Sequence, residues 1–171
     1  MGFTLRFVEN DVVKWSSKHQ TDARTLLIEG EIVPRVRSQG FSTKEDFLTL
    51  CRWKTPRTQS RCARNSPEFI KSVSQTALST ANERLRIEIW TLLTGVNWPT
   101  ASALLHWLHP DEYPIMDFRA LWSLSYSKPP RYDFAFWQDY VSYCRELAKR
   151  CGVSVRTLDR ALWQYSQTNQ R

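Results

Sequence analysis

The segment 93–121 holds the residue types that chemistry on a nucleotide needs. A tight turn at 95–97 separates the end of one expected helix from a second helix that opens at Pro99. The first turn of a helix carries unpaired N–H groups and the positive end of the helix dipole, so such a hairpin can bind a phosphate. A lone acid, Asp117, stands at the start of another expected helix. A carboxylate held a short way along the chain from a phosphate-binding turn is suited to breaking a bond within a nucleotide.

Helices must position these residues, and helical periodicity dominates the chain from residue 42 onward. The longest helical run covers 133–150 and is closed by Gly152. Other expected features are a capping box at 42–45, a helix start at 65–68 with Ser66 as its cap, a helix with Leu85, Ile89, Leu92 and Leu93 on its apolar face, and a final helix from Ser154 to about Tyr165. We therefore predict an all-α fold, in which residues 1–171 form a single helical domain of roughly seven or eight helices.

The first forty residues give weaker signals. Segment 4–8 could form a short strand, and 23–36 is expected to be helical as far as Pro34. We assign no functional residue to this part of the chain.

Length and charge limit the class of protein. The 171 residues suffice to bury a core, and 42% of them are hydrophobic. The formal net charge of +7 at pH 7 favours a polyanionic partner. There is no signal-peptide layout and no apolar run of about 20 residues, so neither secretion nor membrane spanning is expected. We expect a monomer in the cytoplasm, associated with the nucleoid if the source is bacterial.

The cysteines give no sign of a metal site. The chain has four, which are Cys51, Cys62, Cys144 and Cys151. They form no CxxC pair, and the three histidines complete no zinc spacing. We expect buried free thiols, with no metal and no cofactor.

The segment 51–64, called here the basic segment, contains five cations and no acid. The cations are Arg52, Lys54, Arg57, Arg61 and Arg64. Trp53 and Pro56 are interleaved, and this mixture suits a surface that contacts phosphates and stacks a base or a sugar. A solvated basic loop is the alternative interpretation. We expect Lys54 to contact a phosphate, with an amine nucleophile as its alternative role.

Two short motifs carry a family resemblance. Segment 93–101, called here the hairpin segment, reads Leu-Thr-Gly-Val-Asn-Trp-Pro-Thr-Ala, and 113–117 reads Tyr-Pro-Ile-Met-Asp. Their order and separation resemble the helix-hairpin-helix DNA glycosylase superfamily, which includes 8-oxoguanine glycosylases. There, a hairpin of the form Leu-x-Gly-Val-Gly-x-x-x-Ala grips the DNA backbone, and a catalytic aspartate follows a Pro-Val or Pro-Ile segment. The clear resemblance covers 85–124.

The resemblance implies an all-helical protein that binds duplex DNA through a helix-hairpin-helix motif. Beside the basic segment, the DNA contacts it implies are Gly95, Val96, Asn97, Trp98, Thr100 and Arg119. It implies that Asp117 is catalytic, since a carboxylate stabilises the positive charge that builds on the sugar as the base leaves. The base must first swing out of the duplex, and Trp53, Trp98 and Trp122 are the aromatic residues nearest these segments.

Three departures from the family pattern change what is expected. Asn97 replaces the second glycine of the hairpin, and asparagine tolerates a left-handed backbone, so the turn is still expected to form. Pro99 stands where bifunctional members carry a lysine, so no Schiff base and no strand-cleaving lyase step are expected at this site. No cysteine follows Cys151, which excludes the four-cysteine iron–sulfur cluster of some members.

Two of these residues have plainer interpretations. Aspartate is among the best helix N-caps, and Asp117 directly precedes an expected helix. Arg119 could pair with Asp111 or Glu112 instead of with a phosphate. One carboxylate can both cap a helix and act in catalysis.

The segment 147–162 carries a competing motif. It resembles a bacterial repressor helix-turn-helix, with Ala148, Gly152 and Leu158 at the required spacing. The residues that would then face a DNA groove are Arg156, Thr157 and Arg160. Two core helices joined by a glycine turn are the alternative, which we favour because the last helix is strongly apolar.

The leading expectation is a monofunctional DNA N-glycosylase. Such a hydrolase of N-glycosyl bonds would remove a damaged or mismatched base from duplex DNA during repair, without a cofactor. A non-catalytic DNA-binding module of the same fold and a helix-turn-helix transcriptional regulator are the two alternatives.

Overall fold

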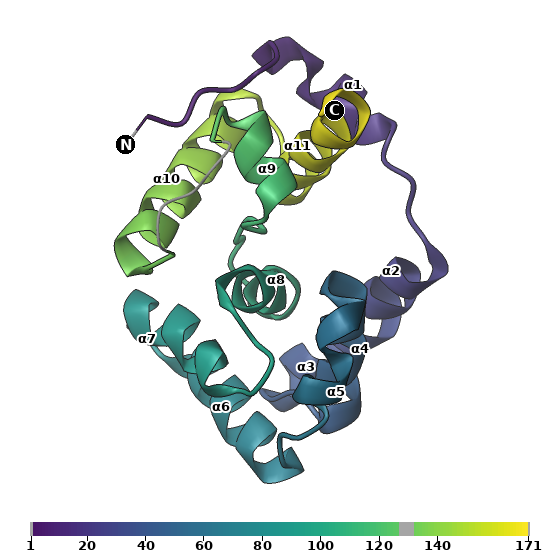
Figure 1. The fold of residues 1–171 in the computed structure, drawn as a ribbon, viewed down its shortest axis with the longest axis vertical. Coiled ribbons are helices and arrows are strands. Elements are labelled where there is room, and N and C mark those ends of the chain that lie inside the picture. Colours follow the sequence, from purple (N-terminus) through teal and green to yellow (C-terminus); the bar gives the residue numbers. More distant parts are fainter. Residues whose placement is uncertain (1, 127–131, 171) are drawn as a thin grey trace. The chain divides into compact units, whose positions relative to one another are not determined.

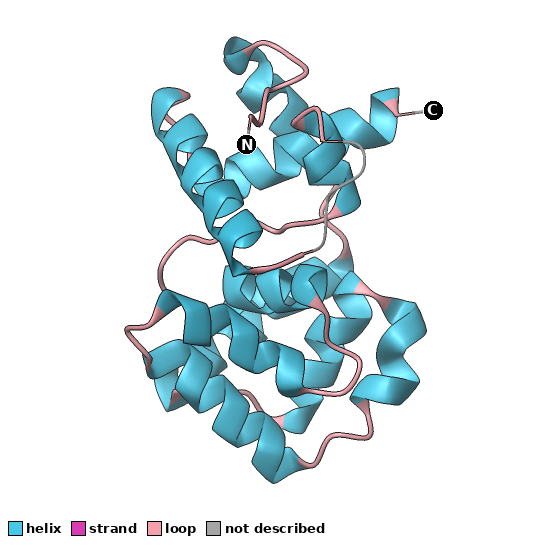
Figure 2. Cartoon of the chain, turned by 60° about the vertical axis from the view of Figure 1, so that its left-hand side comes forward, coloured by secondary structure: helices cyan, strands magenta, loops and turns pink. Residues whose placement is uncertain are grey.

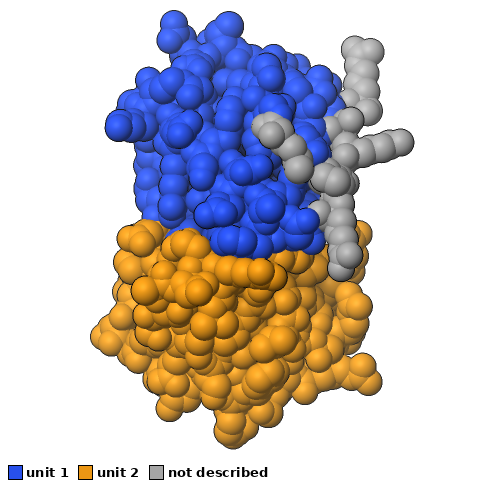
Figure 3. Space-filling model, turned by 90° about the vertical axis from the view of Figure 1, so that its left-hand side faces the viewer, with its two compact units in different colours: residues 1–20, 112–171 blue, residues 21–111 orange. Residues whose placement is uncertain are grey.

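The described part of the chain is helical, with no strand. The computed structural model describes residues 2–126 and 132–170, and within these ranges every regular element is a helix (Figure 2). This confirms the all-α expectation. None of the helices described is long and apolar enough to cross a membrane. The chain divides into two compact units, of which unit 1 comprises 1–20 and 112–171 and unit 2 comprises 21–111 (Figure 3). No feature of the sequence indicated this division.

Unit 2 contains short helices that surround one central helix (Figure 1). Its elements are α2 (Ala23–Leu27), the π-helix η2 (Ile28–Ile32), α3 (Val33–Gln39), α4 (Lys44–Lys54), η3 (Pro56–Thr58), α5 (Gln59–Cys62), α6 (Pro67–Ser79), α7 (Glu83–Glu88), η4 (Ile89–Leu92) and α8 (Trp98–Leu108). Helix α8 is buried from Thr100 to Leu108 except at His106, and α3, α4, α7 and η4 pack against it. A helix that is apolar on every side belongs in a core, so the helix after the turn is also the centre of unit 2.

The helical segment that begins at Ala23 does not end at Pro34, contrary to the sequence expectation. The chain passes from α2 through η2 into α3 and remains helical to Gln39. The wider π turn at Ile28–Ile32 comes directly before α3, where Pro34 occupies the first turn and needs no N–H donor. Gly40 ends the helix with φ of 76°, a left-handed conformation that favours glycine.

The path into the hairpin segment is α7 followed by the 3-10 helix η4. Ile87 and Trp90 are fully buried and Leu93 is 1% exposed. Leu85 and Leu92, which were expected on the apolar face, are 42% and 63% exposed. For Leu92 the expectation assumed a period of 3.6 residues, whereas η4 is a 3-10 helix, in which side chains three residues apart lie on one face.

Unit 1 is also arranged around a single helix. Its elements are η1 (Glu9–Asp11), α1 (Val12–Ser17), α9 (Phe118–Ser123), α10 (Phe134–Arg150) and α11 (Val155–Asn169). Helices α1, α9 and α10 pack on α11. The expected strand at 4–8 is not present. Instead, the Thr4 and Arg6 N–H groups donate to the carbonyls of Leu124 and Ser123, at 3.1 and 2.9 Å.

Most expected helix caps are confirmed. Ser66 and Ser154 each accept a backbone N–H bond at the start of α6 and α11, and Asp133, which was not predicted as a cap, does the same at the start of α10. The capping box of α4 lies one residue later than expected, because Thr43 is the cap and Asp46 bonds back to its N–H group. Helix α11 continues to Asn169, beyond the expected end near Tyr165.

Candidate functional site

The turn at 95–97 depends on glycine at its first position. Gly95 has φ of +88°, and a Cβ atom there would lie 2.8 Å from Cys62 Sγ and 2.9 Å from the Cys62 backbone nitrogen. Both the left-handed backbone and the close approach of α5 therefore require glycine. The Val96 N–H group donates to the Leu93 carbonyl at 3.0 Å, and the Val96 side chain is 8% exposed. Val96 therefore shapes the turn and does not present its N–H group to a ligand.

Asn97 acts in the turn as the N-cap of α8 and does not adopt the expected left-handed conformation. Its φ of −113° and ψ of 178° are extended, so the left-handed conformation inferred from the sequence is wrong. Its side chain accepts bonds from the Thr100 N–H and hydroxyl groups, at 3.1 and 3.0 Å, and so caps α8. Thr100 is 1% exposed, so it positions Asn97 and has no surface to offer to DNA.

Three N–H groups of the hairpin segment remain open to a ligand. Within the ranges 2–126 and 132–170, the N–H groups of Gly95, Asn97 and Trp98 donate to no acceptor. Gly95 and Asn97 precede α8 and Trp98 is its first residue, and the dipole of this helix of 11 residues places partial positive charge at this end. The turn therefore offers three backbone donors to an anion.

The basic segment is folded into short helical elements and a turn, so it is not an extended loop. Arg52 and Lys54 lie in the last turn of α4, where cations complement the helix dipole. Arg57 belongs to η3 and Arg61 to α5, and Arg64 follows in a turn. All four arginines are exposed, whereas Lys54 is half-buried.

Asn65 fastens the basic segment to the hairpin segment. Its side-chain oxygen accepts from the Thr94 N–H group at 2.8 Å, and its side-chain nitrogen donates to the Thr94 carbonyl at 2.9 Å. The same nitrogen donates to the Cys62 carbonyl at 2.9 Å, and Asn65 is 5% exposed. A Cβ at Gly95 would also lie 3.1 Å from Arg61 Cβ. Arg61 is thus held next to the turn, and Arg64 directly precedes the residue that bonds to Thr94.

Trp53 is half-buried, and its indole contacts other side chains of unit 2. Its indole N–H donates to Thr25 Oγ1 at 3.0 Å, and its ring meets that of Trp107 edge-on at 5.3 Å. The interleaved aromatic of the basic segment is therefore structural. Trp98 is also half-buried and is the first residue of α8.

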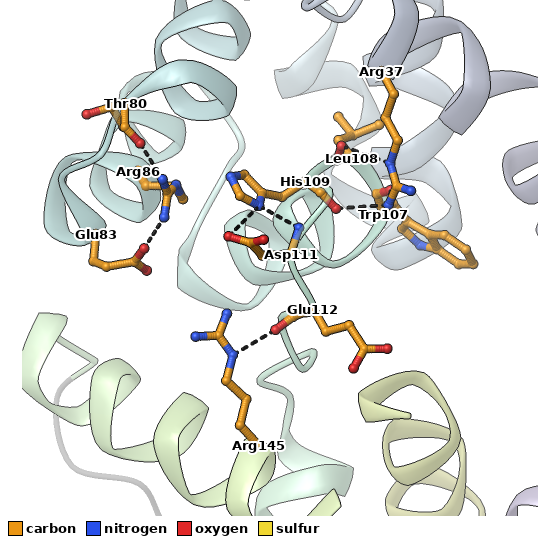
Figure 4. Close-up of polar contacts among 10 residues, drawn as sticks. All are labelled: Arg37, Thr80, Glu83, Arg86, Trp107, Leu108, His109, Asp111, Glu112 and Arg145. Carbon is orange, nitrogen blue, oxygen red and sulfur yellow. Dashed lines mark hydrogen bonds and ion pairs between the residues drawn. The ribbon is translucent and has the colours of Figure 1, made fainter. Parts of the chain in front are cut away.

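The far end of α8 is held by Arg37 (Figure 4). Arg37 donates to the carbonyls of Trp107, Leu108 and His109 at 3.4, 3.4 and 2.9 Å, which occupies the acceptors that end a helix. His109 accepts the Asp111 N–H at 3.0 Å. Burial and the charge of Arg86 lower the pKa of His109, which favours the neutral ring that can accept this bond.

Asp117 lies in unit 1 and is the N-cap of α9. Its Oδ1 atom accepts the N–H groups of Arg119 and Ala120 at 3.1 and 2.9 Å. The carboxylate is half-buried, and its negative charge adds to burial in raising the pKa of Tyr132. The plain interpretation, a helix cap, is therefore confirmed, and the carboxylate also lies near a phenol.

The run that leads to Asp117 is held at both backbone groups of one residue, Ile115. The Ile115 N–H group donates to Asp159 Oδ1 at 3.1 Å, and the Tyr140 hydroxyl donates to the Ile115 carbonyl at 2.8 Å. Asp159 is 7% exposed and Tyr140 is fully buried. These bonds from α10 and α11 fix the backbone two residues before Asp117. Sequence reasoning assigned neither residue, because both lie far along the chain.

Arg119 makes neither of the ion pairs considered from the sequence. Its guanidinium lies 5.1 Å from the centre of the Phe118 ring and 5.3 Å from that of Trp163. Phe118 is 61% exposed, and it directly follows Asp117. An exposed aromatic ring beside the carboxylate is the feature of α9 that the sequence analysis did not single out.

Helix α11 does not have the uncovered face that a DNA-recognition helix needs. Arg156 is 20% exposed in its side chain and pairs with Asp159 at 3.6 Å. Thr157 and Arg160 are half-buried, and α1 and α9 pack on this helix. A helix that enters a major groove needs an uncovered face with outward side chains. The favoured alternative, two core helices joined by a glycine turn, agrees with this packing.

The structure therefore brings the hairpin segment and the basic segment together in unit 2, and places Asp117 and Arg119 in unit 1. No group of three or more His, Cys, Asp and Glu side chains that could hold a metal ion occurs in the part of the chain that is described. Comparisons with protein-family models, with curated proteins and with solved structures gave no significant match to this chain.

Proposed function

We propose that this protein binds the backbone of duplex DNA at the hairpin segment. The observation that carries the proposal is the packing of Arg61 on the turn together with the link through Asn65, which place the basic segment beside three N–H groups with no acceptor among the described residues. Backbone N–H groups and arginine side chains are the usual donors to DNA phosphates, and they carry no sequence information. Binding of this kind is weakly dependent on base sequence and strongly dependent on salt.

We further propose that the protein removes a base from DNA, with Asp117 as the catalytic carboxylate. An ionised carboxylate would stabilise the cationic sugar as the N-glycosyl bond breaks, and water would then take the place of the base. The exposed ring of Phe118 is suited to stacking against a displaced base. Pro99 supplies no amine, so hydrolysis would leave the sugar–phosphate strand intact.

A second candidate, a DNA-binding module without catalysis, is favoured by one observation. Asp117 Oδ1 accepts two backbone bonds and so has a structural role that would retain it without any chemistry. The two candidates share the DNA-binding surface and differ only in base release. The regulator alternative is disfavoured by the covered faces of α11.

The salt dependence of DNA binding tests the proposed surface. We expect replacement of Arg57, Arg61 and Arg64 by alanine to reduce the slope of log affinity against log salt concentration by about 2 to 3, since each cation displaced from a phosphate changes the slope by about one. Affinity for an undamaged duplex would be measured at several salt concentrations by fluorescence anisotropy.

A matched variant controls for the change in net charge. Lys18, Arg24 and Lys149 are exposed and lie outside the basic segment, so their replacement by alanine removes three charges elsewhere. This control is expected to leave the slope within about one unit of the wild-type slope. Equal slopes for the wild type and the arginine variant would exclude the basic segment from the interface.

A further inference from the structure

Aromatic rings that solvent can reach gather along α9 in unit 1. Phe118 is exposed and Trp122 is half-buried. These two positions are four residues apart in α9, so their side chains lie on the same side of the helix. Helix α11 packs against α9 (Figure 1) and contributes Trp163, which is also half-buried.

Two arginines are held against these rings. The Arg119 guanidinium lies 5.1 Å from the centre of the Phe118 ring and 5.3 Å from that of Trp163. The Arg6 guanidinium lies 4.5 Å from the centre of the Trp122 ring, and its Nε atom donates to the Trp122 carbonyl. Arg6 is exposed, and its backbone N–H group donates to α9 as well. The five residues Arg6, Phe118, Arg119, Trp122 and Trp163 are called here the α9 surface.

The segments of the chain that form the α9 surface are basic. They are 2–8, 118–126 and 160–170, which together contain three arginines and no acid. Asp117 directly precedes the second segment, and its Oδ1 atom is bonded to two backbone N–H groups of α9. A surface with this charge complements a polyanion.

We propose that the α9 surface binds single-stranded DNA. Unpaired bases would stack on the Phe118 ring and on the guanidinium planes, and Arg6 and Arg119 would donate to phosphates. Aromatic rings together with cations are the two components of surfaces that bind single strands. In a duplex the faces of the bases are covered by their neighbours, so this surface selects DNA that is already unpaired.

The two arginines favour a nucleic acid over an apolar protein partner. Burial of a guanidinium group without an acceptor is costly, and an apolar helix or sheet offers none. Phosphates and base edges do offer acceptors. The choice of DNA over RNA rests on the function proposed above, because rings and guanidinium groups contact both. Base stacking on the α9 surface does not rest on that function and does not use the hairpin segment.

The affinities for two oligomers test base stacking in the wild-type protein. One is a deoxythymidine oligomer of about 12 nucleotides, and the other is an abasic deoxyribose-phosphate oligomer of the same length, which keeps the phosphates but has no bases. The deoxythymidine oligomer should bind about 5- to 150-fold more tightly, which corresponds to one stacked base. Both affinities would be measured by fluorescence anisotropy in the same buffer. Equal affinities, or no binding of either oligomer, would overturn the proposal.

Phe118→Ala should bring the ratio of the two affinities down toward one. Phe69→Ala is the matched control, because Phe69 is also an exposed phenylalanine in the first turn of a helix but belongs to unit 2. This control should keep the wild-type ratio. Partial unfolding of a variant lowers both affinities equally and leaves their ratio unchanged. An unchanged ratio in Phe118→Ala, or an equal fall in both variants, would overturn the assignment to the α9 surface.

The salt dependence tests the two arginines of the α9 surface. Replacement of both Arg6 and Arg119 by glutamine should reduce the slope of log affinity for the deoxythymidine oligomer against log salt concentration by about 1.4, since each phosphate contact on a single strand contributes about 0.7. An unchanged slope would exclude these arginines from the interface.

Duplex binding and single-strand binding can be separated with the same proteins. The variant without Arg57, Arg61 and Arg64 should lose affinity for duplex DNA and keep the wild-type ratio for the two oligomers. If the wild type binds no duplex but shows that ratio, the proposed function fails and the α9 surface stands. Tighter binding of a uridine oligomer than of the deoxythymidine oligomer of the same length would overturn the choice of DNA.

Discussion

Asp117→Asn is expected to abolish base release while leaving DNA binding nearly intact. Loss of the negative charge removes the group that would stabilise the sugar cation, and the release rate is expected to fall by about 100-fold or more. Asparagine keeps the size of the side chain and caps a helix as well as aspartate does, so α9 should still form. Release would be measured on duplexes that carry uracil, an oxidised purine, an alkylated purine or a mismatch.

Asp133→Asn is the matched control for this substitution. Asp133 is also in unit 1 and also caps a helix, accepting the Phe136 N–H at 2.9 Å. It has no assigned role in catalysis, so base release should stay at the wild-type rate. Equal loss of activity in both variants would trace the effect to helix capping, and full activity of Asp117→Asn would leave that residue with a structural role only.

The product of the wild-type reaction belongs to the same experiment. An intact abasic strand is expected, which breaks only after later treatment with alkali or heat, because Pro99 provides no amine for strand cleavage. Borohydride should trap no protein–DNA adduct. An adduct that disappears in Lys54→Ala would show that Lys54 acts as a nucleophile and that the monofunctional assignment is wrong.

Gly95→Ala is expected to have the largest effect on the hairpin segment. The left-handed backbone costs alanine about 1 to 2 kcal/mol, and overpacking against Cys62 adds about 1 to 3 kcal/mol. The free energy of unfolding should therefore fall by about 2 to 5 kcal/mol in urea titrations. The affinity for duplex DNA should fall as well, because the turn carries the open N–H groups.

Gly40→Ala separates backbone strain from the clash. Gly40 lies in the same unit with φ of +76°, but a Cβ there would meet no atom within 4 Å. The free energy of unfolding of this variant should fall only by the cost of the left-handed backbone, about 1 to 2 kcal/mol. The variant should bind DNA as the wild type does. If both variants lose the same stability and neither loses affinity, the close packing of α5 on the turn has no part in binding.

Local signals in the sequence predicted the parts of this fold that depend on neighbouring residues. Caps such as Ser66 and Ser154 act within one turn of a helix, so residue type and spacing suffice to find them. The burial of Trp90 and the exposure of Leu92 could not be inferred in this way, because the 3-10 geometry of η4 is imposed by packing in unit 2. The helix end that was expected at Pro34 is also absent, because the π turn of η2 comes directly before α3 and Pro34 lies in the first turn of that helix.

The candidate site was predictable only in part. The turn and the exposed arginines follow from residue type, but Asn65 carries no mark in the sequence that would link it to Thr94, 29 residues later. Asn97 was expected to tolerate a left-handed backbone, and it acts as a helix cap instead. Long-range hydrogen bonds of this kind depend on the tertiary fold, which a local pattern does not encode.

The most direct test of the DNA-binding surface is an NMR titration of the isotope-labelled protein with a short undamaged duplex. The backbone N–H signals of Gly95, Asn97 and Trp98 are expected to shift most on binding, because these groups would gain a phosphate acceptor. Signals of Arg61 and Arg64 are expected to move with them at the same DNA concentration. Shifts confined to Arg156, Thr157 and Arg160 of α11, with the hairpin signals unchanged, would contradict the account.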